Sequence, residues 1–385
     1  MPILMKIILD KELLLSTVTP MSGCVSNKNT IPATAGILIT TEENACVLSA
    51  YDLEKGMRTK IAASVLEDGS FILNAVKLLQ IVRAMPGPSV TIEINPKNNQ
   101  TTISSGSASF EFSALPGNEF PDLPYLQGDD CFKIRQCELK DMIAKTSFAV
   151  AQNDPRPSLN GAFFRIQGPS ITAVGCDGNR LALFEKVCKL ETATGKNLAN
   201  LDFIVPGKTL TEISRLLSDS EDPVELQLTR RHLILILGDF ILFSRLIDQQ
   251  YVEYERFIPK QSKIHVRLSC SAFTESLERA MLVTEDKQQG QIKSPVKCIF
   301  TGDTLTVTSV SVVSRVSDTV PCEKEGDDLE IGFNCRLLLD ALRACDTDDI
   351  LLSLSSPLMS MLIEPAEPAP DSRFLLLALP VRLGK

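Results

Sequence analysis

The chain has 385 residues, of which 44% are hydrophobic and 23% charged, a composition typical of a globular protein with two or three domains. The formal net charge of −9 excludes a general affinity for polyanions, so any nucleic-acid surface must be a local concentration of Lys and Arg. The 11 cysteines and 2 histidines have no zinc-ligand spacing and no CxxC pair. We therefore expect free thiols in a reducing cytoplasm, with no metal and no cofactor.

The N-terminal elements are predicted as a strand followed by a helix. Residues 1–9 are apolar and read as the first strand, although translation could begin at Met1 or at Met5. A helix opens at Lys11–Leu14, and Pro20 should end or kink it. A second helix is predicted around Leu78–Met85, with Asn74 as its start signal.

The second helix belongs to a threefold repeat. Similar segments occur at Leu210–Leu217, after Pro206, and at Leu338–Cys345, after Asn334, and each of the three carries an arginine at the same position. Helices should also open at Cys137–Lys140 and Ser271–Thr274, and alternating strands lie between the helices. Polar, Pro/Gly-marked stretches at 124–130 and 259–263 predict domains at 1–127, 128–259 and 260–385.

A hairpin lies in the middle of the repeat and another apolar run ends the chain. Residues 172–184 read as strand, turn and strand, with Asp177-Gly178-Asn179 as the turn. The acidic, Pro-rich stretch Glu364–Ser372 reads as a loop between the last two strands. Leu379–Leu383 could be a buried final strand or part of a binding surface.

Several short motifs carry a family resemblance in their order and spacing. They are Cys-Asp-Gly-Asn-Arg-Leu-Ala at 176–182, Ser-Ala-Leu-Pro with Glu-Phe-Pro-Asp-Leu at 113–123, Leu159-Asn160-Gly161, Phe240 with Ser244-Arg245-Leu246, Ile331–Asn334, and Leu379–Leu383. With these motifs the chain resembles the beta subunits of bacterial DNA polymerase III, the sliding clamps, over nearly its whole length. The resemblance implies an α+β fold of three repeated DNA-clamp domains, each with two helices packed on antiparallel sheets.

The resemblance also implies an assembly and a function. Two chains would form a head-to-tail homodimer, a ring of six domains, in which Phe110, Leu282 and Val283 pack at the interface; ordinary core positions are the alternative for these three. The ring would encircle double-stranded DNA without sequence preference and tether the replicative DNA polymerase. The clamp loader and other proteins with clamp-binding motifs would be further partners, and no membrane is involved.

Basic residues at repeated helix positions fit such a ring. Lys208 and Arg215 are seven residues apart, as are Arg336 and Arg343, so each pair shares a helix face. Sequence-independent phosphate contacts would allow sliding, whereas solvated surface charges are the alternative. The DNA-contacting residues that we predict are Lys28, Arg83, Arg156, Lys208, Arg215, Arg336 and Arg343. After Arg156, Pro157-Ser158 replaces aromatic residues of some relatives, which leaves only the charge contact.

A peptide-binding groove between the second and third domains is also implied. The matching positions are Leu159, Cys176, Gly178, Asn179, Arg180, Leu181, Val252, Arg256, Phe257, Asn334, Leu358, Ser360, Ala378, Leu379, Pro380, Val381, Arg382 and Leu383. The apolar residues would form a floor, and the arginines would hold peptide carbonyls or an acidic residue. Asn179, Val252, Leu337 and Gly384-Lys385 depart from the family pattern, so peptide preference is left open.

Two other classes of function compete with this interpretation. An enzyme could use Cys176 with Asp177, or Asp52 with Glu54, but His232 and His265 have no motif around them and no phosphate loop is present. The prediction is therefore a protein with no catalytic residues of its own. A repeat scaffold that does not bind DNA is the second alternative, and it would not need positive charge repeated on one helix face.

Overall fold

The computed structural model describes residues 5–26, 31–95, 97–124, 128, 130–192, 200–284 and 295–383. Lys28, Met1 and Gly384–Lys385 lie outside these residues. Six α-helices occur in the described part of the chain, two in each third of the sequence, as the repeat predicts. They are α1 (Lys11–Met21), α2 (Ala75–Ala84), α3 (Gln136–Thr146), α4 (Gly207–Leu216), α5 (Cys270–Thr284) and α6 (Cys335–Arg343).

The predicted start and stop signals act as expected. The side chain of Asn74 accepts the backbone N–H of Lys77 at 3.0 Å, and that of Asn334 accepts the N–H of Arg336 at 3.1 Å. At the other end of a helix, α1 stops at Met21, one residue after Pro20. A proline in the last turn removes one backbone donor and so ends the helix there.

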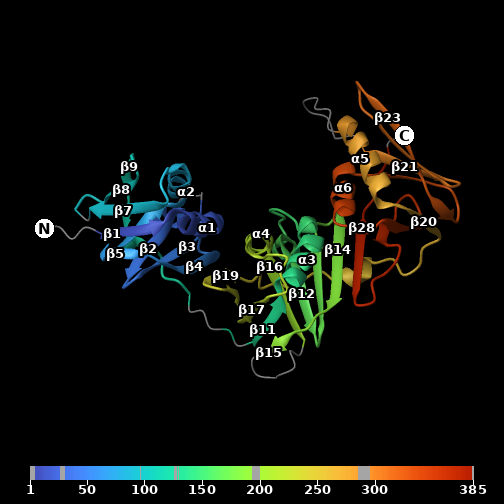
Figure 1. Ribbon diagram of the computed structural model, residues 1–385. Helices are drawn as coiled ribbons and strands as arrows, with labels where there is room; N and C mark the ends of the chain where they lie inside the picture. Colours follow the sequence, from blue (N-terminus) through green and yellow to red (C-terminus); the bar gives the residue numbers. More distant parts are fainter. Residues whose placement is uncertain are drawn as a thin grey trace. The chain divides into compact units, whose positions relative to one another are not determined.

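The chain divides into two compact units, and the first comprises Met1–Cys137, Leu190–Lys196 and Lys208–Leu246. Within this unit α1 packs against α2, and the two helices lie side by side in Figure 1. A five-stranded antiparallel sheet has the order β5 (Ser64–Glu67), β1 (Met5–Asp10), β7 (Ser89–Asn95), β8 (Gln100–Ser105) and β9 (Ala108–Ser113).

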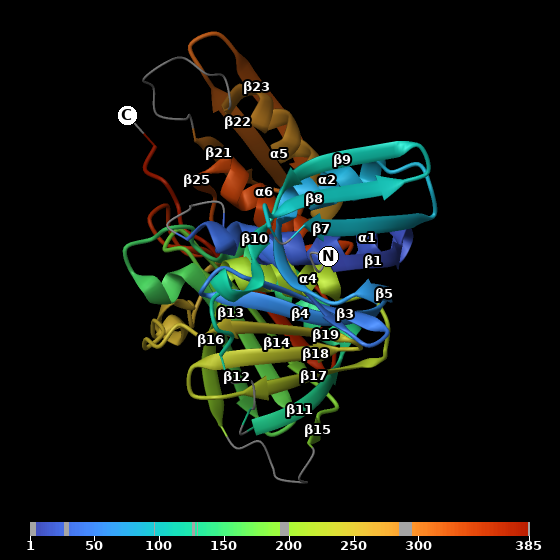
Figure 2. The same ribbon diagram turned by 90° about the vertical axis from the view of Figure 1, so that its left-hand side faces the viewer.

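The first unit also contains a ten-stranded sheet, and Figure 2 shows its strands β4, β19, β18, β17 and β11 running side by side. Its order is β10 (Leu115–Pro116), β6 (Ser70–Asn74), β2 (Gly36–Glu42), β3 (Ala45–Tyr51), β4 (Lys55–Ala62), β19 (Phe240–Arg245), β18 (His232–Leu237), β17 (Pro223–Leu228), β11 (Asp130–Arg135) and β15 (Glu191–Thr192).

The second unit comprises Glu138–Lys189, Asn197–Gly207 and Ile247–Lys385, and it too has one large and one small sheet. The large sheet has the order β16 (Leu201–Pro206), β12 (Gly161–Gln167), β13 (Ser170–Cys176), β14 (Arg180–Val187), β28 (Ser372–Ala378), β27 (Met361–Pro365), β26 (Asp349–Leu354), β20 (Ile264–Ser269) and β24 (Glu323–Glu325). The small sheet has the order β23 (Arg315–Pro321), β22 (Thr304–Val310), β21 (Val296–Thr301) and β25 (Leu329–Phe333).

Each large sheet joins strands from different thirds of the sequence. In the first unit β4 pairs with β19, with Lys55 opposite Ser244 and Arg58 opposite Ile241. In the second unit β14 pairs with β28 over a longer stretch, from Arg180 opposite Ala378 to Lys186 opposite Ser372. Backbone hydrogen bonds therefore cross the junctions between successive repeats.

The segment Leu379–Leu383 does not form the buried final strand that was one of its two predicted roles. The strand β28 ends at Ala378, so Leu379–Leu383 is not a buried final strand. Leu379 is 45% exposed, and only Val381 returns to a strand, in an isolated bridge with Gly332. Pro380 has no N–H to donate to a neighbouring strand, which is one physical reason why the sheet stops here.

Candidate functional site

The hairpin β13–β14 turns at Asp177, whose carboxylate organises the loop. Its Oδ1 accepts the backbone N–H groups of Asn179 and Arg180 at 2.8 and 3.0 Å. Gly178 lies between Asp177 and Asn179 with a φ of +88°, a left-handed conformation that glycine adopts without steric cost. The predicted turn chemistry is therefore present and fixes the start of β14.

Arg180 emerges from this turn into a largely buried position, with its side chain 11% exposed. Its Nε donates to Asp177 Oδ2 at 3.0 Å, and its two terminal nitrogens donate to Asp340 Oδ2 at 3.0 Å and to the carbonyl oxygen of Phe148 at 2.5 Å. Asp340 lies on α6, and Phe148 lies in the short 3₁₀ turn η4 (Ser147–Ala149) after α3. These hydrogen bonds hold the hairpin against both segments. The guanidinium donors of Arg180 are used in contacts within the protein.

A cavity of about 510 Å³ opens beside this hairpin. Most of the predicted peptide-groove residues line it: Leu159, Cys176, Gly178, Arg180, Leu181, Val252, Phe257, Leu358, Ser360, Leu379, Pro380 and Arg382. The floor is apolar and buried, whereas Leu358, Phe257 and Leu379 are large exposed apolar side chains of the lining. Such a cavity suits apolar side chains of an extended segment, with polar contacts at its edge.

Cys176 belongs to the floor of this cavity and is buried. Burial raises the pKa of its thiol, so the neutral form dominates near neutral pH. The neighbouring Asp177 accepts two backbone N–H groups and the Arg180 guanidinium, which leaves it poorly placed to act as a base toward Cys176. The environment of this pair is therefore that of a packed wall, which disfavours a nucleophile–base reading.

The remaining predicted groove residues lie outside the cavity lining. Arg256 pairs with Glu253 at 2.5 Å, and Asn334 caps α6. Asn179 contributes its carbonyl oxygen, which accepts the N–H of Leu379 at 2.9 Å. Ala378, Val381 and Leu383 complete this set: Ala378 is the buried last residue of β28, Val381 bonds Gly332, and Leu383 packs near Gly332.

Two residues of the lining were assigned elsewhere or missed by the sequence reasoning. Arg156, predicted to contact DNA, lines the cavity and pairs with Asp154 at 2.9 Å. Its Nη2 would lie 3.0 Å from a Cβ added to Gly178, so the turn glycine makes room for it. Leu377 on β28 was missed, although its place in the apolar run just before Leu379 was a usable signal.

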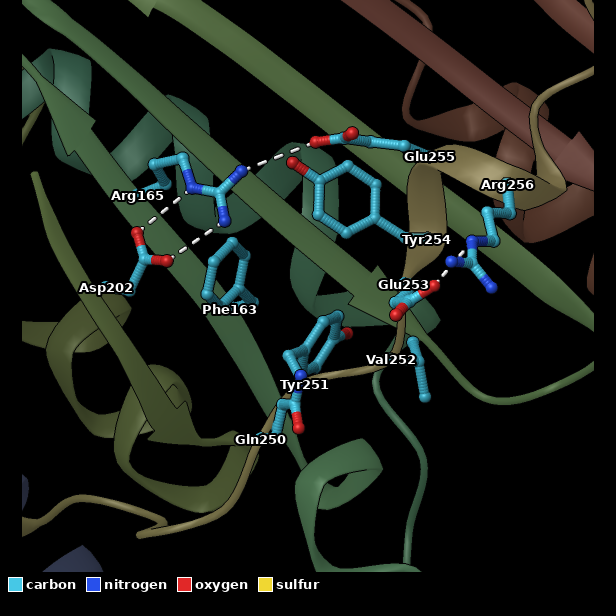
Figure 3. A pocket seen from close by; sticks show the side chains of 10 residues that line it. All are labelled: Phe163, Arg165, Asp202, Gln250, Tyr251, Val252, Glu253, Tyr254, Glu255 and Arg256. Carbon is cyan, nitrogen blue, oxygen red and sulfur yellow. Dashed lines mark hydrogen bonds and ion pairs between the residues drawn. The ribbon is translucent and has the colours of Figure 1, made fainter.

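A second cavity, of about 420 Å³, is lined by the segment Gln250–Arg256 and is drawn in Figure 3. The guanidinium of Arg165 lies there between Asp202, at 2.9 Å, and Glu255, at 3.3 Å, and stacks over Phe163 at 5.1 Å. Tyr251 donates its hydroxyl to the carbonyl oxygen of Val174 at 3.1 Å. These contacts anchor the segment that carries Val252 into the first cavity.

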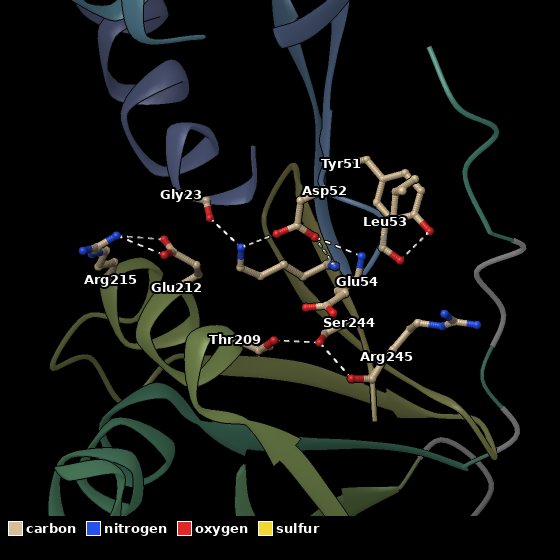
Figure 4. Close-up of polar contacts among 11 residues, drawn as sticks. Gly23, Tyr51, Asp52, Leu53, Glu54, Thr209, Glu212, Arg215, Ser244 and Arg245 are labelled. Atoms are coloured by element: carbon tan, nitrogen blue, oxygen red, sulfur yellow. Dashed lines mark hydrogen bonds and ion pairs between the residues drawn. The ribbon is translucent and has the colours of Figure 1, made fainter. Parts of the chain in front are cut away.

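The first unit contains a turn built like the one at Asp177. Asp52 Oδ1 accepts the backbone N–H groups of Glu54 and Lys55 at 3.0 and 2.8 Å, and Leu53, directly after Asp52, has a φ of +77°. The ammonium of Lys55 donates to Asp52 Oδ2 and to the carbonyl oxygen of Gly23, each at 2.7 Å (Figure 4). Asp52 is therefore neutralised by Lys55 rather than paired with Glu54 as an acid–base couple.

The same region shows why Gly23 is a glycine. A Cβ at this position would lie 2.0 Å from Glu212 Oε2, so the carboxylate of Glu212 on α4 occupies the space beside Gly23 and would have to move to admit a side chain. Glu212 is buried and accepts Arg215 at 3.0 Å, as Figure 4 shows. Arg215 lies at the exposed end of this contact.

The other predicted DNA-contacting residues lie on exposed helix faces, with Lys28 outside the described residues. Arg83, Lys208, Arg336 and Arg343 are exposed, while their apolar neighbours, such as Leu338 and Leu342, are buried. Arg343 pairs with Glu278 of α5 at 2.8 Å. Both Arg215 and Arg343 therefore have a carboxylate beside them, which reduces the net charge that they offer to a phosphate.

The predicted interface residues differ in exposure. Phe110 is 42% exposed on β9, which is an edge strand of the five-stranded sheet. Leu282, on α5, is 76% exposed, whereas its neighbour Val283 is only 7% exposed and packs within its own domain. The strand β23 is the corresponding edge of the four-stranded sheet, and most of its residues are exposed.

Neither a metal cluster nor a membrane span is found in the described residues. No group of three His, Cys, Asp or Glu side chains in the described ranges could hold a metal ion. No helix in that part of the chain is long and apolar enough to cross a membrane.

Three copies of one repeat define a clamp-type protein. Each repeat has two helices on antiparallel sheets, and the large sheets continue from one repeat to the next. Family models agree: the N-terminal, central and C-terminal domains of the DNA polymerase III beta subunit match residues 5–124, 133–253 and 255–382. The chain belongs to this family, the bacterial beta sliding clamps, and its function is that of a DNA sliding clamp.

Individual relatives are similar over almost their full length. The beta sliding clamp of Proteus mirabilis is 30% identical over 364 residues, which cover 94% of this chain and 96% of the relative. The sliding clamp structure from Bacillus subtilis has a TM-score of 0.88 at 26% identity and covers 99% of this chain and 100% of that one. A beta subunit structure from Eubacterium rectale gives a TM-score of 0.87 at 28% identity, covering 98% and 100%. The predicted family and three-domain fold are thereby confirmed.

Proposed function

We propose that two copies of this chain close head to tail into a ring around duplex DNA in the cytoplasm, and that the ring tethers the replicative DNA polymerase without catalysing a reaction. The observation that carries this proposal is the cavity beside the β13–β14 hairpin, because the positions implied by the family resemblance converge on it from five separate stretches of sequence. The clamp loader and other proteins with a clamp-binding motif would use the same cavity.

Two unpaired sheet edges support ring closure. An exposed edge strand presents free backbone donors and acceptors and invites pairing with another chain. In a head-to-tail dimer β9 of one copy would pair with β23 of the other, and this would bury Phe110 and Leu282. Val283 is already buried in its own domain, so it would support the interface only by packing within that domain.

Exposed arginines on α2, α4 and α6 support a weak, non-specific attraction to phosphates. Arg215 and Arg343 each share their charge with a carboxylate, so a single contact would be feeble and would be lost in high salt. Retention on DNA would then depend on the closed ring. Sliding requires this, since no contact fixes a register.

A topological experiment tests the ring. The protein would be loaded by a clamp loader onto nicked circular DNA, the circle would be linearised, and bound protein would be followed. Retention on the circle with loss through free ends is the expected result. Equal retention on both forms would mean ordinary surface binding, and no retention on either would favour a scaffold without DNA encirclement.

A pair of matched variants sharpens this test. Phe110→Asp places a charge on the edge strand β9 and should give monomers in analytical ultracentrifugation that fail to be retained on circles. Leu66→Asp places the same charge on an exposed residue of β5, at the opposite edge of the same sheet. It should leave both results unchanged, and a dimer that survives Phe110→Asp would contradict the proposed interface.

A further inference from the structure

Two cysteines of the C-terminal domain lie where two chain segments meet. Cys270 is the first residue of α5, directly after β20, and Cys345 follows the end of α6 by two residues, just before β26. The strands β20 and β26 are neighbours, with Ser269 opposite Asp349. The N–H of Cys270 also donates to the carbonyl oxygen of Asp348 at 2.8 Å.

The two thiols point to the same place at the end of α6. Cys270 Sγ donates to the carbonyl oxygen of Leu342 and Cys345 Sγ to that of Ala341, each at 3.7 Å, so they meet adjacent residues of the helix. Each thiol also shifts the pKa of the other, which places the two sulfur atoms beside each other. Cys270 is buried and Cys345 is half-buried, which leaves one side of the pair open to a small reagent.

We propose that Cys270 and Cys345 form a reversible disulfide and so make this corner of the C-terminal domain a redox-sensitive modification site. The oxidant belongs to the class of small peroxides, with hydrogen peroxide as the simplest member. This inference goes beyond the clamp function and does not depend on ring closure or on DNA binding.

The interaction between the two neighbouring thiols lowers the pKa of Cys270 and raises the pKa of Cys345, which makes Cys270 the nucleophile. Its thiolate attacks one oxygen of the peroxide, forming a sulfenic acid and releasing hydroxide. The Cys345 sulfur then attacks the Cys270 sulfur, and the displaced hydroxyl leaves with the Cys345 proton as water. Two thiols are oxidised to one disulfide, and one peroxide is reduced to two waters.

The disulfide would join the start of α5 to the end of α6. These helices already pack together, and Arg343 of α6 pairs with Glu278 of α5. A covalent link at this point would restrict the separation of the two helices in partly unfolded forms. We therefore expect the oxidised protein to have a higher Tm than the reduced protein.

Peptide mapping of the folded full-length protein after treatment with hydrogen peroxide tests the proposal. A cross-linked peptide containing Cys270 and Cys345, lost again on reduction, is the expected product, together with the loss of two titratable thiols and a rise in Tm. Cys345→Ser should abolish the cross-link and the rise in Tm. Cys270→Ser is the second variant, in case the first affects folding.

Cys137→Ser provides the matched control, because Cys137 occupies the first turn of α3 as Cys270 does in α5. This variant should form the cross-link like the unmodified protein. The proposal would be overturned if Cys270 and Cys345 stayed reduced in the folded, peroxide-treated protein. It would also be overturned if the two thiols were over-oxidised separately, or if other cysteines formed disulfides in their place.

Discussion

The turn at Asp52 and the turn at Asp177 use the same hydrogen bonds but sit beside different surfaces. Each aspartate accepts two backbone N–H groups and pairs with the cation three residues later, Lys55 or Arg180. The same cation donates to a carbonyl oxygen just after a helix, that of Gly23 after α1 or that of Phe148 after α3. Each turn is followed by a strand that pairs with a strand of the next repeat, β4 with β19 and β14 with β28. The second turn, however, lies at the edge of an open cavity.

The side chains beside the two turns account for this difference. Tyr51 precedes Asp52, and its ring packs on Phe243 at 5.5 Å, while a Cβ on Gly56 would lie 2.3 Å from Phe243. At the matching places of the second turn, Cys176 stands for Tyr51, Leu181 for Gly56 and Leu377 for Phe243, so neither aromatic ring has a counterpart there, and all three residues line the cavity. One backbone design is thus combined with large aromatic rings in the first unit and with small or aliphatic side chains around a cavity in the second.

The largest effect should come from removing the buried cations. Arg180→Met leaves Asp177 and Asp340 without their partner, and Lys55→Met does the same to Asp52; both cations are largely buried, at 11% and 7% side-chain exposure. We expect each change to lower the free energy of unfolding by about 3 kcal/mol, measured by urea denaturation. Only Arg180→Met should also weaken peptide binding. Arg156→Met, which removes an exposed cation from the same cavity, should leave the free energy of unfolding almost unchanged.

Filling the cavity should convert the second junction into a copy of the first. Cys176→Phe introduces an aromatic ring where Tyr51 stands in the first turn, and it should lower the affinity for a clamp-binding peptide by at least about tenfold, or roughly 1.4 kcal/mol. Fluorescence anisotropy with a labelled peptide would measure the change. Tyr51→Phe is the control and should leave the affinity unchanged. Undiminished binding to Cys176→Phe would show that the peptide binds elsewhere.

The positive-φ residues of these two turns, Gly178 and Leu53, should respond differently to substitution. Gly178→Ala adds a Cβ in a left-handed conformation and close to Arg156, and should destabilise by about 1 kcal/mol. Leu53→Gly removes such a Cβ and should cost little or stabilise by up to about 1 kcal/mol. The midpoints of thermal unfolding would show both effects. Equal destabilisation by both changes would mean that the conformations of the turns differ.

The smallest effect concerns acid. Hydrogen bonds from Arg156 hold the pKa of Asp154 below its usual value of 3.8. A carboxyl with a lowered pKa in the folded state contributes stability above its usual pKa, and this is lost as pH falls through the lowered value. Peptide affinity and Tm of Asp154→Asn should therefore vary less than those of the unmodified protein between pH 5 and about pH 3. Parallel curves for the two proteins would exclude this contribution.

Much of the fold could be predicted from the sequence because the repeat gives three readings of one pattern. Asn74 and Asn334 identified helix starts, and the Asp177 turn was recognisable from residue type alone. The pairing of β4 with β19 and of β14 with β28 could not be predicted, since it joins residues far apart in sequence with no local signal. The contacts of Arg180 with Asp340 and Phe148 could not be predicted either, because they depend on the tertiary structure, and its role toward a peptide stays a prediction.

The shared sheets have a consequence for anyone who would take the middle repeat out of the chain. A fragment cut at the family boundaries would keep β14 and β19 but lose their partners β28 and β4, exposing the backbone of two long apolar strands. Such edges recruit strands from other molecules, so the fragment should aggregate or swap segments rather than remain a monomer. Shorter soluble fragments would have to keep each large sheet whole. Because each of these sheets contains strands of the middle repeat, the chain would have to be cut inside that repeat, and the two fragments would be co-expressed so that together they supply all of its strands.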